Sequence, residues 1–157
     1  MSRYGTLLLN KIVEQNDVAA LKRYGITADH LSTDAEKAAF RFIEQYAGYN
    51  SGNAPSYATI TQEVPGFDYI PSVDDSYEYL QRKVKDHALK MEVMRMFNGS
   101  NGETPLVSKM FAEKSGHEFV DSLISELERA KIGTDIRNKL GTNLKTDGAK
   151  FLAEYDK

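Results

Sequence analysis

Apolar residues recur every three or four positions along most of this chain, which is the spacing of one face of an α-helix. Residues that cap or end helices interrupt the pattern, so it predicts a series of helices separated by turns. In the first half we expect helices over 3–15, 17–24, 33–47 and 56–64, with a single turn near Leu31. Few segments alternate with the two-residue period of a strand. The sequence therefore predicts an all-α fold.

The second half of the chain contains the longest periodic stretch, from about residue 75 to 97. A run rich in Asn and Gly at 98–102 is typical of a turn and is expected to end this helix. A short helix over about 105–114 and a second long helix over 116–131 are expected to follow. Two long helices joined by a short one predict a helical hairpin.

Polar residues mark the expected helix starts. Thr33-x-x-Glu36 and Ser115-x-x-Glu118 have the spacing of capping boxes, in which two side chains satisfy backbone amides reciprocally. Ser72 or Asp74 is expected to cap the longest helix, and Thr104 the short one with Pro105 in its first turn. These boundaries predict a helical bundle, the head, over 1–72 and a hairpin over 75–132, followed by a linker over 133–157.

The predicted hairpin carries more apolar surface than two helices can bury against each other. We therefore expect it to mediate self-association, although a simple core stripe is the other interpretation. Residues 82–95 are mainly basic and 116–128 mainly acidic, so the arms could attract within one chain or between chains, or form two solvated faces. The candidate contact residues are Leu80, Val84, Met91, Met94, Phe97, Leu123 and Leu127.

The C-terminal segment differs in composition, because Gly and polar residues predominate over 133–148. This composition predicts a tether. Beyond it, Phe151, Leu152 and Tyr155 have helical spacing. A helix of about nine residues is not stable alone in water, so its apolar face needs a docking surface. We expect it to dock on a neighbouring subunit, and the alternative is a terminal helix packed on its own domain.

Composition narrows the chemistry that this chain can perform. The 157 residues include no cysteine, which excludes a disulfide scaffold and a thiolate site. The net charge of -3 argues against an electrostatic clamp on nucleic acid. The three histidines share no ligand spacing and are interpreted as surface or capping residues. No phosphate-binding loop or nucleophile motif occurs, so we expect no catalytic, cofactor or metal residue in this chain. Because no export signal or membrane-spanning run is found, we expect a cytoplasmic protein without membrane contact.

Several segments, taken in order and spacing, resemble the N-terminal domain of bacterial and phage replicative DNA helicases, the DnaB-like family. The segments are Tyr4-Gly5-Thr6-Leu7-Leu8-Leu9, the helix over 18–25, the turn over 26–31, the helix over 40–46, Pro55-Ser56-Tyr57-Ala58-Thr59-Ile60 and Tyr77-x-Tyr79-Leu80. The resemblance covers most of 1–132 and rests on core and turn positions. Residues 133–155 are similar to the linker of phage and mobile-element members.

The resemblance implies a non-catalytic domain that forms a collar on a hexameric helicase. Hairpins would pair between subunits, primase and helicase-loader proteins would dock on the collar, and DNA would be engaged only by the full-length hexamer. ATP and Mg²⁺ would bind in a C-terminal ATPase domain beyond this chain, and the linker helix would dock on a neighbouring motor. The alternatives are a free-standing all-α replication accessory or loader protein, and a small enzyme of another kind. A phosphate-binding loop in the reading frame beyond Lys157 would distinguish the helicase domain from the accessory or loader protein.

Overall fold

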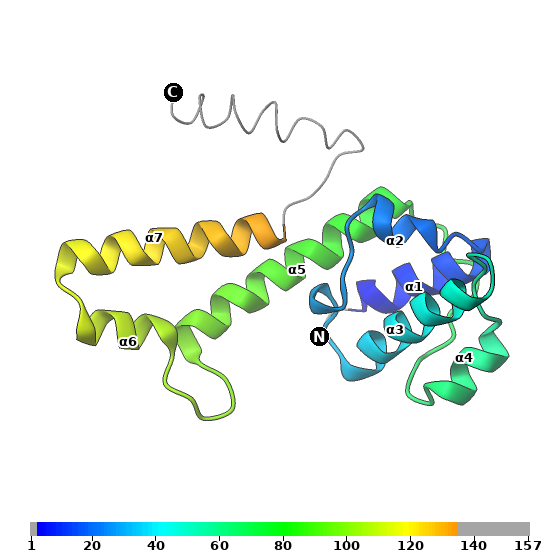
Figure 1. Cartoon of the computed structure of the whole chain (residues 1–157), viewed down its shortest axis with the longest axis horizontal. Helices are drawn as coiled ribbons and strands as arrows, with labels where there is room; N and C mark the ends of the chain where they lie inside the picture. Colours follow the sequence, from blue (N-terminus) through cyan, green and yellow to red (C-terminus); the bar gives the residue numbers. More distant parts are fainter. Residues whose placement is uncertain (1–2, 135–157) are drawn as a thin grey trace, which may run out of the picture.

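The computed structural model describes residues 3–134, and this part of the chain is all-α, with seven α-helices and one 3₁₀ helix. Figure 1 shows a compact head, from which the long helix α5 extends to a hairpin completed by α6 and α7. The elements are α1 (Tyr4–Gln15), α2 (Ala19–Arg23), the 3₁₀ helix η1 (Ala28–His30), α3 (Asp34–Tyr49), α4 (Tyr57–Glu63), α5 (Tyr77–Asn98), α6 (Leu106–Glu113) and α7 (Gly116–Gly133).

Most helix starts lie where the sequence predicted them. Thr33 caps α3, and the capping box of Ser115 with Glu118 opens α7. The start of α5 was wrong by a few residues, because Ser76 rather than Ser72 or Asp74 accepts the hydrogen bond from the Tyr79 amide. The predicted cap of α6 was also displaced, from Thr104 to Pro105. Each difference moves a boundary without changing the order of elements.

The core of the head is built around α1. Leu8, Leu9 and Ile12 of α1 are almost completely buried, and α3 contributes Ile43 with no exposed surface. The first turns of α5 complete this core, since Leu80 and Val84 belong to the same cluster. The division predicted between residues 72 and 75 therefore does not match the packing. The head includes the N-terminal half of α5, and the hairpin consists of its C-terminal half with α6 and α7.

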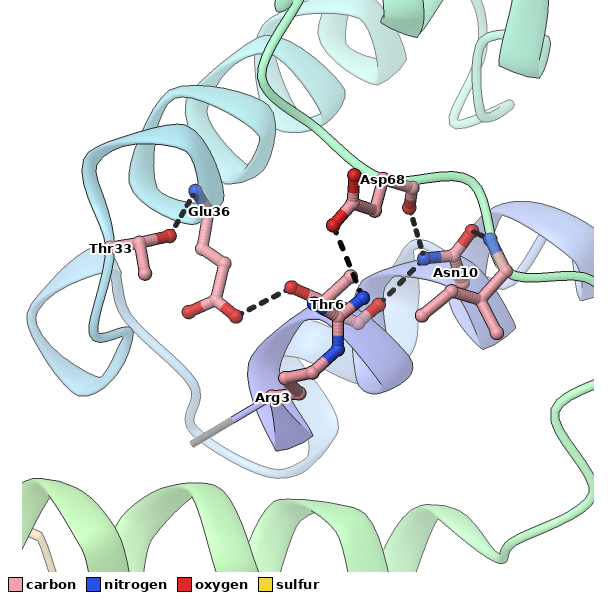
Figure 2. A network of polar contacts seen from close by, with 7 residues as sticks. Arg3, Thr6, Asn10, Thr33, Glu36 and Asp68 are labelled. Atoms are coloured by element: carbon pink, nitrogen blue, oxygen red, sulfur yellow. Dashed lines mark hydrogen bonds and ion pairs between the residues drawn. The ribbon is translucent and has the colours of Figure 1, made fainter. Parts of the chain in front are cut away.

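A buried amide fixes the loop between α4 and α5 onto α1. The Asn10 side chain is fully buried, and its Nδ2 donates to the carbonyl oxygens of Thr6, at 2.9 Å, and of Asp68, at 3.0 Å. Its Oδ1 accepts from the Ile70 amide at 2.9 Å. Figure 2 shows these bonds joining the helix to the loop. Because an unpaired buried amide is costly, this network specifies how the loop lies.

A buried carboxylate joins the starts of α1 and α3. Glu36 is 2% exposed, and its carboxylate accepts from the Thr6 hydroxyl at 2.7 Å (Figure 2). It also accepts from the Ser32 amide at 3.1 Å. A Cβ on Gly5 would lie 2.8 Å from the same carboxylate and 2.9 Å from the Leu31 side chain, so a larger residue there would displace side chains that are buried. Arg3 pairs with Asp68 at 3.1 Å beside a cleft of about 400 Å³. The polar groups around this cleft thus hold three chain segments together.

The turn after α5 depends on one glycine. Gly99 has a φ of +76°, and a Cβ there would lie 2.5 Å from the Glu103 carbonyl oxygen. Only glycine combines this backbone conformation with such a close approach. The turn redirects the chain into α6, which lies at the far end of the hairpin from the head, and α7 then returns along α5 (Figure 1).

Candidate interaction surface

The seven residues predicted to mediate self-association fall into three different environments. Leu80 and Val84 are 0% and 3% exposed and belong to the head core. A partner chain could reach them only if the head opened. Assigning these two residues to an intermolecular contact was therefore wrong, because α1 already covers the stripe in the first half of α5.

Three further predicted residues are partly buried within the hairpin. Leu123 and Leu127 lie on the same face of α7 as the buried Ala130, with helical spacing of three and four residues. This face packs on α5 and α6, where Met91 is also partly buried. These side chains chiefly hold the arms of the hairpin together.

The last two predicted residues are open to solvent. Met94 and Phe97 are 50% and 48% exposed, and they lie one turn apart on α5. Their exposure contrasts with Met96, which is 6% exposed and faces the interior of the hairpin. Met94 and Phe97 are thus accessible to a partner chain, and their role in self-association stays a prediction.

Sequence reasoning missed several other exposed apolar side chains on the hairpin. Val120 and Ile124 are each 49% exposed, and they lie beside the Leu123 and Leu127 stripe, so the apolar sector of α7 is wider than one packing face. Phe111 at the tip is 72% exposed, although its ring meets Phe119 edge-on at 5.4 Å. We call the following set the exposed hairpin residues: Met94, Phe97, Leu106, Phe111, Val120, Ile124 and Ile132. For Val120 and Ile124, the adjacent apolar pairs that they form with Phe119 and Leu123 were the signal that could have revealed them.

Charges on the hairpin pair within single helices. Lys90 pairs with Asp86 at 3.6 Å and Arg95 with Glu92 at 2.5 Å on α5, while Arg129 pairs with Glu126 at 3.3 Å on α7. All six side chains are at least partly exposed, so each pair contributes little to stability. These three ion pairs each join residues of the same helix, so they do not represent the predicted attraction between the basic and acidic arms.

The linker-docking residues Phe151, Leu152 and Tyr155 lie outside the described residues, as does most of the predicted linker. Gly133, which was assigned to the linker, is instead the last residue of α7.

The described part of the chain contains neither a metal site nor a membrane-spanning helix. No group of three or more His, Asp or Glu side chains within 3–134 is arranged to hold a metal ion. None of the helices described combines the length and the apolar character needed to cross a bilayer. Comparisons of the chain with protein-family models, with curated proteins and with solved structures find no match.

Proposed function

We propose that this chain is the non-catalytic N-terminal assembly domain of a replicative hexameric DNA helicase. The observation that carries the proposal is a head with its own core and a projecting hairpin, whose exposed hairpin residues remain 38–74% exposed in the described chain. A second copy of the hairpin would cover them. Symmetric pairing of one surface with itself is a common way to close such a contact.

The head supports this assignment because its outer surface is not used in packing against the hairpin tip. Its apolar side chains form one core around α1, and none of the described residues beyond Val84 belongs to that core. The outer surface of the head would then serve as a docking surface for a primase or a helicase loader in the cytoplasm. ATP, Mg²⁺ and DNA would be handled by a motor domain that follows this chain.

The oligomeric state of the chain tests the proposed assembly role. We expect light scattering at high micromolar concentration to give a dimer or a larger closed assembly. Met94→Asp should shift it toward the monomer, because a charge cannot be buried in an apolar contact without a large cost. Gln45→Asp on the exposed side of α3 adds the same charge to the head and serves as the matched control. A monomeric wild type, or equal effects of the two variants, would overturn the assembly role.

The helicase assignment has a separate test. The reading frame beyond Lys157 should encode Gly-x-x-x-x-Gly-Lys-Ser/Thr within the next hundred or so residues, since the motor needs a phosphate-binding loop. Its absence would favour a replication accessory or loader protein and would leave the self-association result standing.

A further inference from the structure

His30 lies where the head meets the returning arm of the hairpin. It is the last residue of η1 and is 7% exposed. Its Nδ1 lies 3.0 Å from the Thr27 amide, and its Nε2 lies 3.1 Å from the carbonyl oxygen of Gly133, the last residue of α7. One imidazole ring therefore bridges two segments that are 103 positions apart in the sequence.

The partners of the ring fix its tautomer. A backbone amide can only donate, so Nδ1 accepts from Thr27 and the ring proton of the neutral imidazole lies on Nε2. That Nε2–H then donates to the Gly133 carbonyl. The last carbonyls of a helix have no partner inside the helix, and His30 supplies one from a different part of the molecule. The capping box of Thr27 and His30 orients the donor.

Neighbouring contacts hold the surroundings of His30 in place. Lys85 of α5 is 2% exposed, and its Nζ donates to the carbonyl oxygen of Tyr24 at the end of α2. α5 also packs against η1. On the side of α7, Ala130 is 8% exposed, which places the last turn of this helix against other parts of the chain. The bridge thus sits in a closed junction between η1, α5 and α7.

We infer that His30 is a positioning residue that clasps the C-terminal end of α7 to the head, and thereby fixes the position of the last turn of α7 relative to the head. Without the clasp, the hairpin would be joined to the head chiefly through α5, and the end of α7 would be held only by its packing on that helix. With it, the returning arm and the head move as one body. The inference concerns geometry within one chain and does not depend on the helicase assignment.

Distance measurements between spin labels test this inference directly, because the chain has no cysteine of its own. Arg41→Cys on α3 and Glu128→Cys on α7 place one label on the head and one on the returning arm, both at exposed positions. Lys22→Cys with Arg41→Cys provides a reference pair within the head. Each labelled chain is diluted with an excess of unlabelled chain, so that only distances within one molecule are measured. We expect a single head-to-arm distance as narrow as that of the reference pair.

Two substitutions at His30 separate the hydrogen bond from the shape of the side chain. His30→Phe fills the space but cannot donate to Gly133, and it should broaden the head-to-arm distance while leaving the reference distance unchanged. His30→Gln keeps an N–H donor at a similar reach and should retain the narrow distance. An unchanged distribution in His30→Phe would overturn the clasp. So would a broad distribution in the wild type, which keeps the inference testable even if His30→Phe does not fold.

Discussion

The head and the hairpin share one helix, α5, but the head buries the apolar residues of its half and the hairpin leaves several of them exposed. Leu80 is completely buried in the head, whereas Met94, fourteen residues further along the same helix, is 50% exposed. The head surrounds its part of α5 with α1 and η1, but the hairpin has only α6 and α7 to cover the rest. A long helix that leaves its core therefore carries apolar surface to a place where a single chain cannot cover it.

Polar side chains differ between the two regions in the same direction. The head buries Asn10, Glu36 and Lys85, and each of them bonds to a segment distant in the sequence or to a neighbouring helix start. The hairpin keeps its charges in solvent-exposed pairs within one helix. Buried polar contacts specify one arrangement because leaving them unmade is costly, while exposed pairs leave the surface adaptable. The head is thus built as a rigid base and the hairpin as a contact surface.

The two halves of α5 should respond very differently to the same loss of side-chain volume. Leu80→Ala should lower the free energy of unfolding by about 2–5 kcal/mol, because it opens a cavity in a packed core. Met94→Ala, the matched control on the same helix, should change it by less than about 0.5 kcal/mol. Urea titrations followed by circular dichroism measure both. Similar losses in the two variants would show that the hairpin is packed as tightly as the head.

Two neighbouring positions on α7 should separate folding from association. Leu127→Asp places a charge on the face that packs within the hairpin, and it should lower the free energy of unfolding by about 1–3 kcal/mol. Ile124→Asp places the same charge on the exposed side and should leave the stability of the monomer within about 0.5 kcal/mol, while weakening self-association. Urea titration at low concentration and sedimentation at high concentration give the two quantities. If Ile124→Asp destabilised the monomer as strongly as Leu127→Asp, α7 would have no outward apolar face.

The junction between head and hairpin should respond to acid. Burial lowers the pKa of His30 below its ordinary value of 6.5; the Gly133 carbonyl and Asp29 oppose this shift, and Lys85 adds to it. The unfolded chain therefore takes up a proton at His30 before the folded chain does. The contribution of His30 is fully present above about pH 6.5 and is lost as the pH falls toward its folded pKa. In His30→Gln this part of the pH dependence of unfolding should be missing, and a pH profile identical to that of the wild type would contradict the assignment.

The smallest effect is expected at a single hydroxyl of the head. The Tyr57 hydroxyl donates to the Asn10 carbonyl oxygen at 2.7 Å, and burial, aided by Glu14 and Tyr69, raises its pKa to about 12. Tyr57→Phe should cost about 1 kcal/mol at neutral pH through loss of the hydrogen bond. The wild type should also lose stability between pH 10 and about 12, where only the unfolded tyrosine ionises, and this loss should be reduced in Tyr57→Phe. Unfolding at neutral and alkaline pH tests both expectations, and an unchanged alkaline profile would exclude this role.

The positions of helices could be predicted because their signals are local. The side chains of Thr33, Ser56 and Ser115 accept hydrogen bonds from amides three residues ahead, and that geometry depends only on the nearby backbone. The repeat of apolar residues likewise follows from the helix period. The all-α class and the order of elements were therefore correct from sequence. Errors were confined to boundaries, as at Ser76, where several candidate caps stand close together.

The candidate contact surface was only partly predictable. Periodicity placed Leu80, Leu123 and Met94 in equivalent stripes, but the structure buries the first, partly covers the second and exposes the third. The spacing of a stripe shows that a face is apolar and does not show what covers it. Val120 and Ile124 were missed for the same reason, since their exposure depends on which face of α7 meets α5.

Capping and periodicity act within a few residues along the chain, so the helices, the all-α class and the apolar character of the hairpin follow from local sequence. Which part of α5 belongs to the head, which side chains remain exposed and how His30 meets Gly133 depend on tertiary packing. The physical reason is that burial, and the pairing of a buried polar group, depend on neighbours contributed by distant segments. The residues next to a position in the sequence do not show which distant segments will pack against it in the folded chain.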